Sequence, residues 1–333
     1  MPADNQDGAK SAGRPPAPSP RPRRLVFAAY AFALLPVLAL AELAAHAVEV
    51  RGTVPDDDYK AAAQAVGKEL RDDDLVIFAP GWSDPVGRMH FGALVTPERA
   101  AFTDVSRFAR AFEVSQGGAT RPELAWFQPV SETRHGSLVV RRLDNPRYEK
   151  VIDDLLDHVG PDKMTVHART GANDAECRFV VGGAAAGTWG PATPAKRFQC
   201  GHGHVGVVTM PDLAYTPRRC IYAPATDGAT RLRITFLDVK FGAKIRFSHG
   251  IHVEGERAKK GAPVEAVFKV PVETKGEGEH EKTYGRAVHR DGDGWSTLDV
   301  DTRELAGNTG DLVVELHATS AQERKYCFAG TTR

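Results

Sequence analysis

The sequence predicts an α+β protein in three parts: an N-terminal membrane helix, a small α/β unit, and an antiparallel β-sandwich of jelly-roll type. Three observations predict this fold. An uncharged apolar run at 25–41 follows a cluster of arginines, strand and helix patterns alternate up to about residue 160, and short strands separated by turn signals fill the rest of the 333-residue chain. The expected units are 54–160 for the α/β domain and 161–333 for the sandwich.

The composition is that of an ordinary globular protein with balanced charge. Lys and Arg together number 43, as do Asp and Glu, so the formal net charge is zero. Nucleic-acid-binding proteins normally carry a basic excess, and none is present here. The 32 glycines and 22 prolines favour many turns, as β-rich proteins require. We therefore expect no nucleic-acid partner.

Residues 1–24 are predicted to be a disordered cytoplasmic tail. They are rich in proline and hold no bulky apolar residue after Met1, so they cannot bury enough surface to offset the entropy lost on ordering. Their positive charges outnumber those just beyond the apolar run, where Arg51 is the first. The positive-inside rule then predicts a single-pass protein of the cell membrane, with a cytoplasmic N-terminus and the bulk of the chain outside the cytoplasm, in the periplasm.

Residues 25–47 are predicted to be the transmembrane anchor that ties the protein to the membrane. With Glu42 and His46 near the head groups, the apolar stretch reaches roughly 20 residues, enough to span a bilayer core of about 30 Å. A cleaved signal peptide is the alternative, because 39–41 and 45–47 both fit the small-x-small cleavage pattern.

The four cysteines predict two disulfides in an exported domain. Three pairings are possible, and we favour Cys177–Cys200 and Cys220–Cys327. The first bond would close a segment rich in Gly, Ala and Pro that has little means of holding itself. The second would tie an early strand of the sandwich to its last strand. No C-x-x-C pair is present, so redox catalysis and a zinc ribbon have little support.

Helices and strands alternate in 54–160. Apolar residues three and four apart predict helices, and short apolar runs bounded by charge, Pro or Gly predict buried strands. The expected helices are 54–70, one opening at Thr96, and 147–159, and the expected strands are 75–79, 108–115 and 137–143.

Beyond residue 160 the pattern is that of short strands without a helix of useful length. Residues 231–236 alternate between polar and apolar side chains, as in a half-buried strand. The spacing of about 8–12 residues between turn signals is typical of a β-sandwich. Strands are expected at 163–168, 176–181, 204–209, 219–223, 230–239, 243–249, 263–272, 284–289, 295–300, 311–317 and 323–329.

A candidate ligand site follows the strand at 75–79, in the loop 80–88. Ligands bind at the carboxyl ends of strands in open α/β sheets, so Trp82, Asp84 and Arg88 would form a polar and aromatic site for a sugar or an anion. The alternative is a turn-rich loop whose Trp packs into the core and whose Asp84–Arg88 pair holds its shape. No phosphate-loop spacing and no G-x-S-x-G motif is present.

The most metal-like stretch of the sequence contains His202 and His204. An H-x-H on a strand can present both imidazoles to one ion, but such a site also needs a following carboxylate, and 205–209 supplies none. Whether His249 and His252 approach His202 and His204 in the folded chain is left open. We expect no metal site, with His202 and His204 as weak candidates.

The segment Asp291–Gly294 superficially resembles a calcium loop. The third acidic ligand of that pattern is replaced by Trp295, so the EF-hand pattern fails and a hairpin turn is expected instead. A structural calcium ion elsewhere in the sandwich is left open, and no other cofactor is expected. Aromatic residues that would form a carbohydrate platform or pack in the core are Trp126, Trp189, Tyr222, Tyr284 and Trp295.

Short blocks of the chain resemble parts of known membrane proteins. Residues 74–88 and 110–115 are similar to soluble extracytoplasmic regions attached to bacterial polytopic sugar-transferase-like membrane proteins. Blocks at 218–221, 294–295, 299–302 and 326–328 resemble the carbohydrate-binding-like β-sandwich that follows those regions. This chain has one apolar segment instead of many, so the resemblance implies an accessory or binding role more than catalysis.

Together these features predict a membrane-anchored extracytoplasmic binding or accessory protein of the bacterial envelope, related to glycans and more a binder than an enzyme. Its partner would be a glycan or an envelope protein. One alternative is an exported glycan-active hydrolase that uses acidic residues such as Asp84 or Glu113, since glycosidases need two carboxylates. Another is a structural partner domain of a membrane complex.

Overall fold

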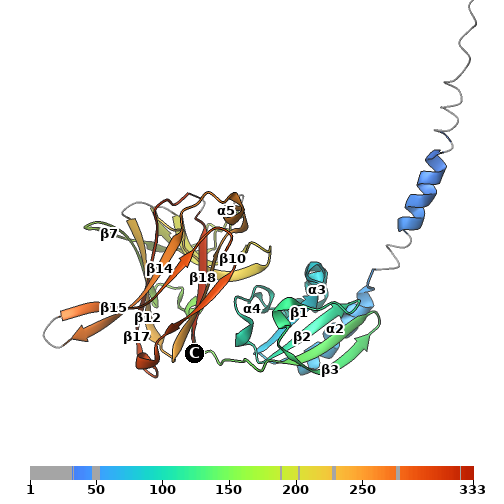
Figure 1. The fold of residues 1–333 in the computed structure, drawn as a ribbon, viewed down its shortest axis with the longest axis horizontal. Helices are drawn as coiled ribbons and strands as arrows, with labels where there is room; N and C mark the ends of the chain where they lie inside the picture. The colour runs from blue at the N-terminus through green and yellow to red at the C-terminus, as the bar shows by residue number, and fades with distance from the viewer. Residues whose placement is uncertain are drawn as a thin grey trace, which may run out of the picture. The chain divides into compact units, whose positions relative to one another are not determined.

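The computed structural model describes residues 32, 34–46, 53–187, 190–201, 203–226, 230–274, 278–322 and 324–333 (Figure 1). The chain divides into two units, 1–53 and 54–333. The predicted tail 1–24 and part of the predicted anchor 25–47 lie outside the described residues. In the described part of the chain, which includes a helical stretch at 34–46, no helix is both long and apolar enough to span a bilayer.

The first part of the second unit is a four-stranded sheet with the strand order β1-β2-β4-β3. Strand β1 pairs in parallel with β2, and the other neighbours are antiparallel. The predicted strands at 75–79, 108–115 and 137–143 are confirmed as β1, β2 and β4, and β3 was not predicted. The strands are β1 (Asp74–Ala79), β2 (Arg110–Gln116), β3 (Gln128–His135) and β4 (Leu138–Asp144).

Both faces of this sheet are covered by other segments. The apolar side chains of β1 alternate between the two faces and pack against a different set of residues on each. On one face, Val76 and Phe78 pack against α2 and α3; on the other, Leu75 and Ile77 pack against segments near 102–108 and 124–127. The helices are α2 (Asp56–Glu69), α3 (Asp84–Phe91) and α4 (Pro97–Ala100), with short 3-10 turns at Gly81–Ser83, Gly92–Leu94, Val105–Arg107 and Pro122–Leu124.

The loop expected at 80–88 is largely helical. Pro80 follows a cis peptide bond, and the chain then forms a 3-10 turn that leads into α3. Pro85 lies in the first turn of α3, where a missing N–H costs nothing. Gly87 lets this helix approach the sheet closely, since a Cβ there would lie 2.3 Å from the Phe78 ring.

The helix predicted at 147–159 is wrong. This segment is mostly irregular, and Ile152 donates its backbone N–H to Thr332 O at 2.9 Å. Strand β5 (Asp153–Asp154) then pairs with β18, and a 3-10 turn, Leu155–His158, buries Leu155 in the sandwich core. Pairing with the last strand therefore outweighs the local helical pattern.

The rest of the chain is an antiparallel β-sandwich, as predicted. In the described residues one sheet has the strands β16 (Ser296–Asp301), β13 (Lys244–Ile251), β18 (Tyr326–Thr332), β11 (Pro217–Tyr222), β10 (Gly203–Pro211), β9 (Lys196–Cys200) and β8 (Arg178–Val181), with β5 against β18. The other has β15 (Gly278–His289), β14 (Val264–Thr274), β17 (Thr309–Ala318), β12 (Thr230–Lys240), β6 (Met164–Thr170) and β7 (Asn173–Glu176).

One large hydrophobic core lies between these sheets. From β11 to β18 the chain changes sheet at every step except β14 to β15, so consecutive strands supply opposite walls of the core. Phe247 packs on Phe328 of its own sheet and edge-on to Phe268 of the other, with ring centroids 5.2 and 4.5 Å apart. This packing holds in place the sheet that carries the β10–β11 connection.

Two local expectations in the sandwich are wrong. A short helix, α5 (Val253–Ala258), interrupts the strands where none was expected. The turn at 291–294 does not close a hairpin, because β15 and β16 belong to different sheets. Asp-Gly permits a tight turn but does not by itself decide which strand the chain meets next.

The structure places the predicted cysteine pairs at bonding distance. The sulfur atoms lie 2.06 Å apart in Cys177–Cys200 and 2.07 Å apart in Cys220–Cys327. The second bond links β11 to β18, which are neighbours in one sheet. Both of its cysteines are fully buried.

Residues 101–106 join the four-stranded sheet region to the sandwich through hydrogen bonds. The Phe102 carbonyl accepts from Arg218 Nη1, and the Thr103 carbonyl accepts from Trp295 Nε1, both at 2.9 Å. These donors come from β11 and from the segment before β16, so two segments of the sandwich that are far apart in the sequence hold this part of the chain.

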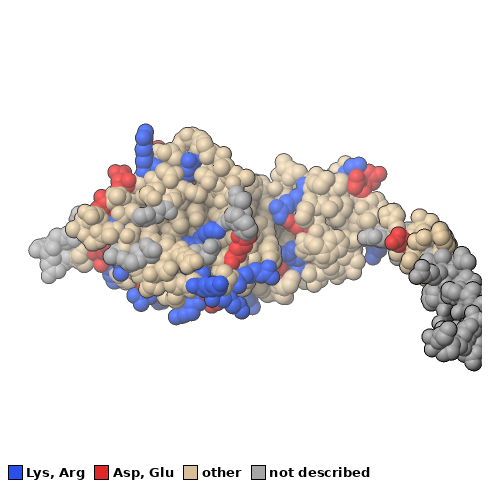
Figure 2. All heavy atoms as spheres, turned by 90° about the horizontal axis from the view of Figure 1, so that it is seen from above, with Lys and Arg blue, Asp and Glu red and all other residues tan. Residues whose placement is uncertain are grey.

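Ionic groups reinforce the same connection. Arg333 donates to Asp104 at 2.7 Å, and Arg246 and Arg333 both donate to the Ser106 hydroxyl. Hydrogen bonds from Arg246 are the largest cause that holds the pKa of Asp299 at about 2. On the face shown in Figure 2, basic and acidic side chains lie close together at several places, as the balanced composition leads one to expect.

Candidate functional site

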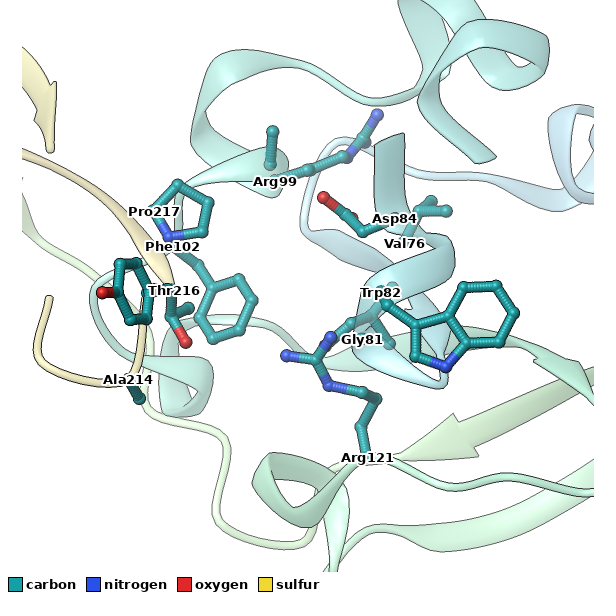
Figure 3. A pocket seen from close by; sticks show the side chains of 13 residues that line it. Val76, Gly81, Trp82, Asp84, Arg99, Phe102, Arg121, Ala214, Thr216 and Pro217 are labelled. Carbon is teal, nitrogen blue, oxygen red and sulfur yellow. The ribbon is translucent and has the colours of Figure 1, made fainter. Parts of the chain in front are cut away.

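A pocket of about 430 Å³ lies where the turn after β1 meets the loop between β10 and β11. Its walls come from β1, from the 3-10 turn and start of α3, from α4 and the residues after it, and from the sandwich loop. Its aromatic and charged lining includes Trp82, Asp84, Arg99, Arg121 and Tyr215. Figure 3 shows all of these except Tyr215 with labels.

Two aromatic side chains of this pocket are unusually exposed. Trp82 is 71% exposed and Tyr215 is 60% exposed. Trp82 lies on the 3-10 turn directly after the buried strand, and Tyr215 lies in the β10–β11 loop with a φ of 59°. The Tyr215 hydroxyl accepts a hydrogen bond from Arg257, whose guanidinium carbon is 5.1 Å from the ring centre, so the ring is held in place.

Arg121 brings a positive charge into the pocket. Its Nε and Nη2 donate to Glu123 at 3.1 and 2.6 Å, and its Nη1 donates to the Phe78 carbonyl at 3.3 Å. In Figure 3 the guanidinium points toward the space between Gly81 and Thr216. Burial would raise the pKa of Glu123, but its hydrogen bonds, chiefly from Arg121, lower the pKa overall, so the pair stays charged.

Asp84 lines the pocket from the first residue of α3, and it pairs with Arg88 one turn later. Arg88 itself does not line the pocket. Its Nε is buried without a hydrogen-bond partner among the described residues, and burial lowers the pKa of the guanidinium. Arg88 therefore acts on the site through the carboxylate of Asp84.

Arg99 forms part of the pocket floor and has a structural role. Its guanidinium donates to the carbonyls of Asp74, Leu94 and Arg71 at 2.9, 2.8 and 2.5 Å. These bonds satisfy backbone groups that would otherwise be buried without partners. The side chain is buried, and its positive charge faces carbonyl dipoles instead of a carboxylate.

The predicted site residues are thus partly brought together. Trp82 and Asp84 line one pocket, while Arg88 contributes only through Asp84. Trp82 is exposed, which disfavours the alternative in which it packs into the core. Sequence reasoning missed Arg121 and Tyr215. The available signal for Tyr215 was an aromatic residue inside a turn between Pro211 and Pro217.

The metal candidates do not converge in the described part of the chain. His202 lies outside the described residues. His204 packs on Tyr222, with ring centroids 4.9 Å apart, and burial lowers its pKa. His252 caps α5 through a hydrogen bond from Glu254 N at 3.5 Å. Within the described residues, no group of three or more His, Cys, Asp or Glu side chains is placed to hold a metal.

The acidic turn at 291–294 uses its carboxylates within the protein. Asp291 pairs with the buried Arg324 at 2.6 Å and accepts from Gly261 N at 3.0 Å. Asp293 accepts from Arg290 N at 2.8 Å. These contacts give the turn a structural role, and the calcium expectation stays untested.

His249, His289 and Tyr326 form a buried polar cluster in the sandwich. The His249 ring centroid is 5.2 Å from that of His289 and 5.7 Å from that of Tyr326. Glu256 of α5 bonds His289 Nε2 at 2.8 Å and also accepts from two backbone N–H groups of the 291–294 turn. Burial is the largest cause that lowers the pKa of His249 to about 4, so this imidazole is neutral at pH 7.

The aromatic residues singled out from the sequence do not form a carbohydrate platform in the described part of the chain. Four of them are half-buried and engaged within the protein. Trp126 packs beside the α/β core, the Trp295 indole bonds the Thr103 carbonyl, and Tyr284 bonds Glu304. Trp189 lies outside the described residues.

Asp84 and Glu113, the acidic residues considered for hydrolysis, do not share a pocket. Glu113 is buried and accepts from Arg121 N at 2.6 Å and from Arg141 Nη1 at 3.1 Å. It lines a different pocket of about 460 Å³. A glycosidase needs two carboxylates on either side of one bond, and this pair does not provide that arrangement.

No protein-family model matches the sequence, and no curated protein matches it. The solved structures found to be similar include carbohydrate-binding modules. One is the Clostridium thermocellum endo-1,4-β-D-xylanase 10B with xylohexaose, at 12% identity, covering 35% of this chain and 22% of that chain, with a TM-score of 0.23. The matched region is thus less than a quarter of the xylanase chain.

In two further structures the match covers a larger share of the other protein's chain. A family 16 carbohydrate-binding module has 12% identity, covers 38% of this chain and 83% of the module, and has a TM-score of 0.24. A structure described for promiscuous specificity in carbohydrate-binding modules of the β-sandwich superfamily has 9% identity. The match covers 59% of this chain and 65% of that chain, with a TM-score of 0.29. At these TM-scores the likeness decides nothing about the ligand of this chain.

Proposed function

We propose that this chain is a glycan-binding accessory protein of the bacterial envelope, anchored to the membrane by 25–47, and that it binds a saccharide in the pocket between Trp82 and Tyr215. The observation that carries the proposal is the exposure of these two rings, 71% and 60%, at the lining of one pocket. Large aromatic side chains are normally buried, and two of them exposed at the lining of one pocket are the kind of apolar surface that marks a ligand site.

The chemistry of the pocket supports this ligand class. The C–H faces of a sugar ring pack on aromatic rings, and a few well-placed polar groups fix its orientation. Here the carboxylate of Asp84 and the guanidinium of Arg121 supply acceptors and donors for hydroxyl groups, and each is itself held by an ionic partner. Such preorganised polar groups reduce the ordering cost of binding.

Replacing either exposed ring is expected to abolish most binding. The probe is an oligosaccharide array, followed by calorimetric titration with the strongest hit. Trp82→Ala and Tyr215→Ala are each expected to weaken binding by about 10-fold or more, as for central aromatic contacts in other interfaces. Because both side chains are exposed, the melting temperature of the protein should stay nearly unchanged.

Tyr148→Ala is the matched control. Tyr148 is a partly exposed aromatic residue that does not line this pocket, and its removal should leave affinity unchanged. If the array shows no binding to any glycan, or if Tyr148→Ala weakens binding as much as Trp82→Ala does, the proposed function is wrong.

The anchor has its own test. We expect the native protein in the membrane fraction with an N-terminus upstream of Leu25, because the apolar stretch is longer than the usual signal-peptide core of about 7–15 residues. Mass spectrometry of the intact native protein measures this. A mature chain that starts near Glu42 or Val48 would show cleavage and remove the anchor from the proposal.

A further inference from the structure

We propose that the ligand of the Trp82–Tyr215 pocket is an anionic glycan, whose sugar carries a carboxylate or a phosphate ester. This inference rests on the proposed function and names the substrate class of the same site. It is argued from the charges around the pocket, from their partners, and from the hydrogen-bonding capacity that these partners leave free.

Two of the charged groups at the pocket are compensated within the protein. Asp84 pairs with Arg88, and Arg121 pairs with Glu123 through two hydrogen bonds. These pairs contribute local dipoles but almost no net charge. Neither the carboxylate of Asp84 nor that of Glu123 is therefore left to attract a cation.

Two further guanidinium groups at the pocket have no carboxylate partner in the part of the chain that the structure describes. Arg99 lines the pocket and donates only to backbone carbonyls. Arg257 bonds the hydroxyl of Tyr215 and lies over its ring. Two other carboxylates beside the lining are also compensated: Asp212, which accepts from Ala214 N and Thr216 N, pairs with Arg218, and Glu113, which accepts from Arg121 N, pairs with Arg141. Among the described groups at the lining or bonded to it, Arg99 and Arg257 are thus the positive charges that are left without a carboxylate partner.

Arg121 retains a donor that can reach a ligand. Its Nη1 carries two N–H groups, of which one donates to the Phe78 carbonyl at 3.3 Å. In Figure 3 the Arg121 guanidinium points toward the space between Gly81 and Thr216. A carboxylate or phosphate oxygen there would accept a charge-assisted hydrogen bond, the stronger kind. Gly81 allows this approach, since a Cβ at Gly81 would lie 3.0 Å from Nη1.

The test compares an acidic and a neutral glycan of the same shape on the full chain. The probes are tri-galacturonic acid, its carboxyl-reduced neutral form, and a phosphorylated hexose. We expect the acidic trisaccharide to bind at least about 10-fold more tightly than the reduced one, as the loss of one charge-assisted hydrogen bond predicts. The phosphorylated hexose distinguishes a phosphate from a carboxylate as the preferred anion. Equal affinity for the acidic and reduced trisaccharides would overturn this inference and leave the proposed function intact, whereas no binding of any glycan defeats the proposed function itself.

Two variants separate charge from structural damage. Glu123→Gln removes the anion that competes for Arg121, so it should strengthen binding of the acidic trisaccharide, a gain that misfolding cannot produce. Arg257→Gln replaces an exposed side chain that also holds the Tyr215 ring, so it should weaken binding of the acidic probe more than binding of the neutral one. Arg303→Gln, an exposed arginine outside the pocket, is the matched control. Weaker binding of the acidic probe by folded Glu123→Gln, or no effect of Arg257→Gln, would contradict the inference.

Discussion

A chain without the Cys220–Cys327 disulfide is expected to lose about 5 kcal/mol of folding free energy, enough to unfold many domains of ordinary stability. The bond closes a segment of 107 residues. In the chain-entropy model the loss grows with the length of the closed loop, so this bond is expected to contribute more than the other. It also joins β11 to β18 in the sheet that carries the Tyr215 loop.

The measurement is urea unfolding of the double variant Cys220→Ala/Cys327→Ala. The matched comparison is Cys177→Ala/Cys200→Ala, whose bond closes 23 residues and should contribute about 3 kcal/mol. Cys220 and Cys327 are both fully buried, so their replacement by Ala adds little new polar surface. A larger loss for the 23-residue bond would show that the loop-length argument does not apply here, and four free thiols in a native peptide map would remove both bonds.

Acid is expected to destabilise the protein between pH 6.5 and pH 4 through His249. Burial lowers the pKa of this imidazole from 6.5 to about 4. Between these values the unfolded chain binds a proton that the folded protein does not, so stability rises with pH across the window. The contribution of neutral His249 to the free energy of unfolding is fully present above pH 6.5. It is lost as pH falls toward 4, by about 3 kcal/mol in total.

His249→Phe is expected to remove most of this pH dependence. Phe keeps an aromatic ring next to Phe247 and removes the titrating nitrogens; the other titratable groups around it are His289, Glu256, Asp293 and Tyr326. The measurement is the unfolding free energy at pH 7 and pH 4.5 for the wild type and the variant. His135→Phe, on the other sheet region, is the matched control. An unchanged slope in His249→Phe would assign the acid sensitivity to other groups.

Most strands of the sandwich could be predicted because each carries its own signal, whereas β7 and β9 were not predicted. Alternation at 231–236 and apolar runs between turn residues are local properties, and the structure confirms them as strands such as β12. The segment 147–159 failed for the opposite reason. Its apolar spacing fits a helix, but pairing of 153–154 with β18 is a long-range contact that no local pattern records.

Only the residues on one wall of the pocket could be predicted from the sequence. Trp82 and Asp84 follow a buried strand, so their place at its carboxyl end could be expected from topology. Arg121 and Tyr215 come from other parts of the chain and reach the pocket only through folding. Arg88 was grouped with the site because it lies in the same segment after the strand. Its spacing of four residues from Asp84 makes the two an intrahelical pair, and that pair was part of the alternative interpretation of this segment.

The hydrogen bonds from the sandwich to residues 101–106 have a consequence for how this pocket can be inherited. One wall comes from the turn after β1 and the other from the β10–β11 loop, and these bonds keep the two walls in register. A gene fusion that transferred either half alone would carry only one wall of the pocket. Recombination within this chain would therefore preserve the pocket only when both halves move together.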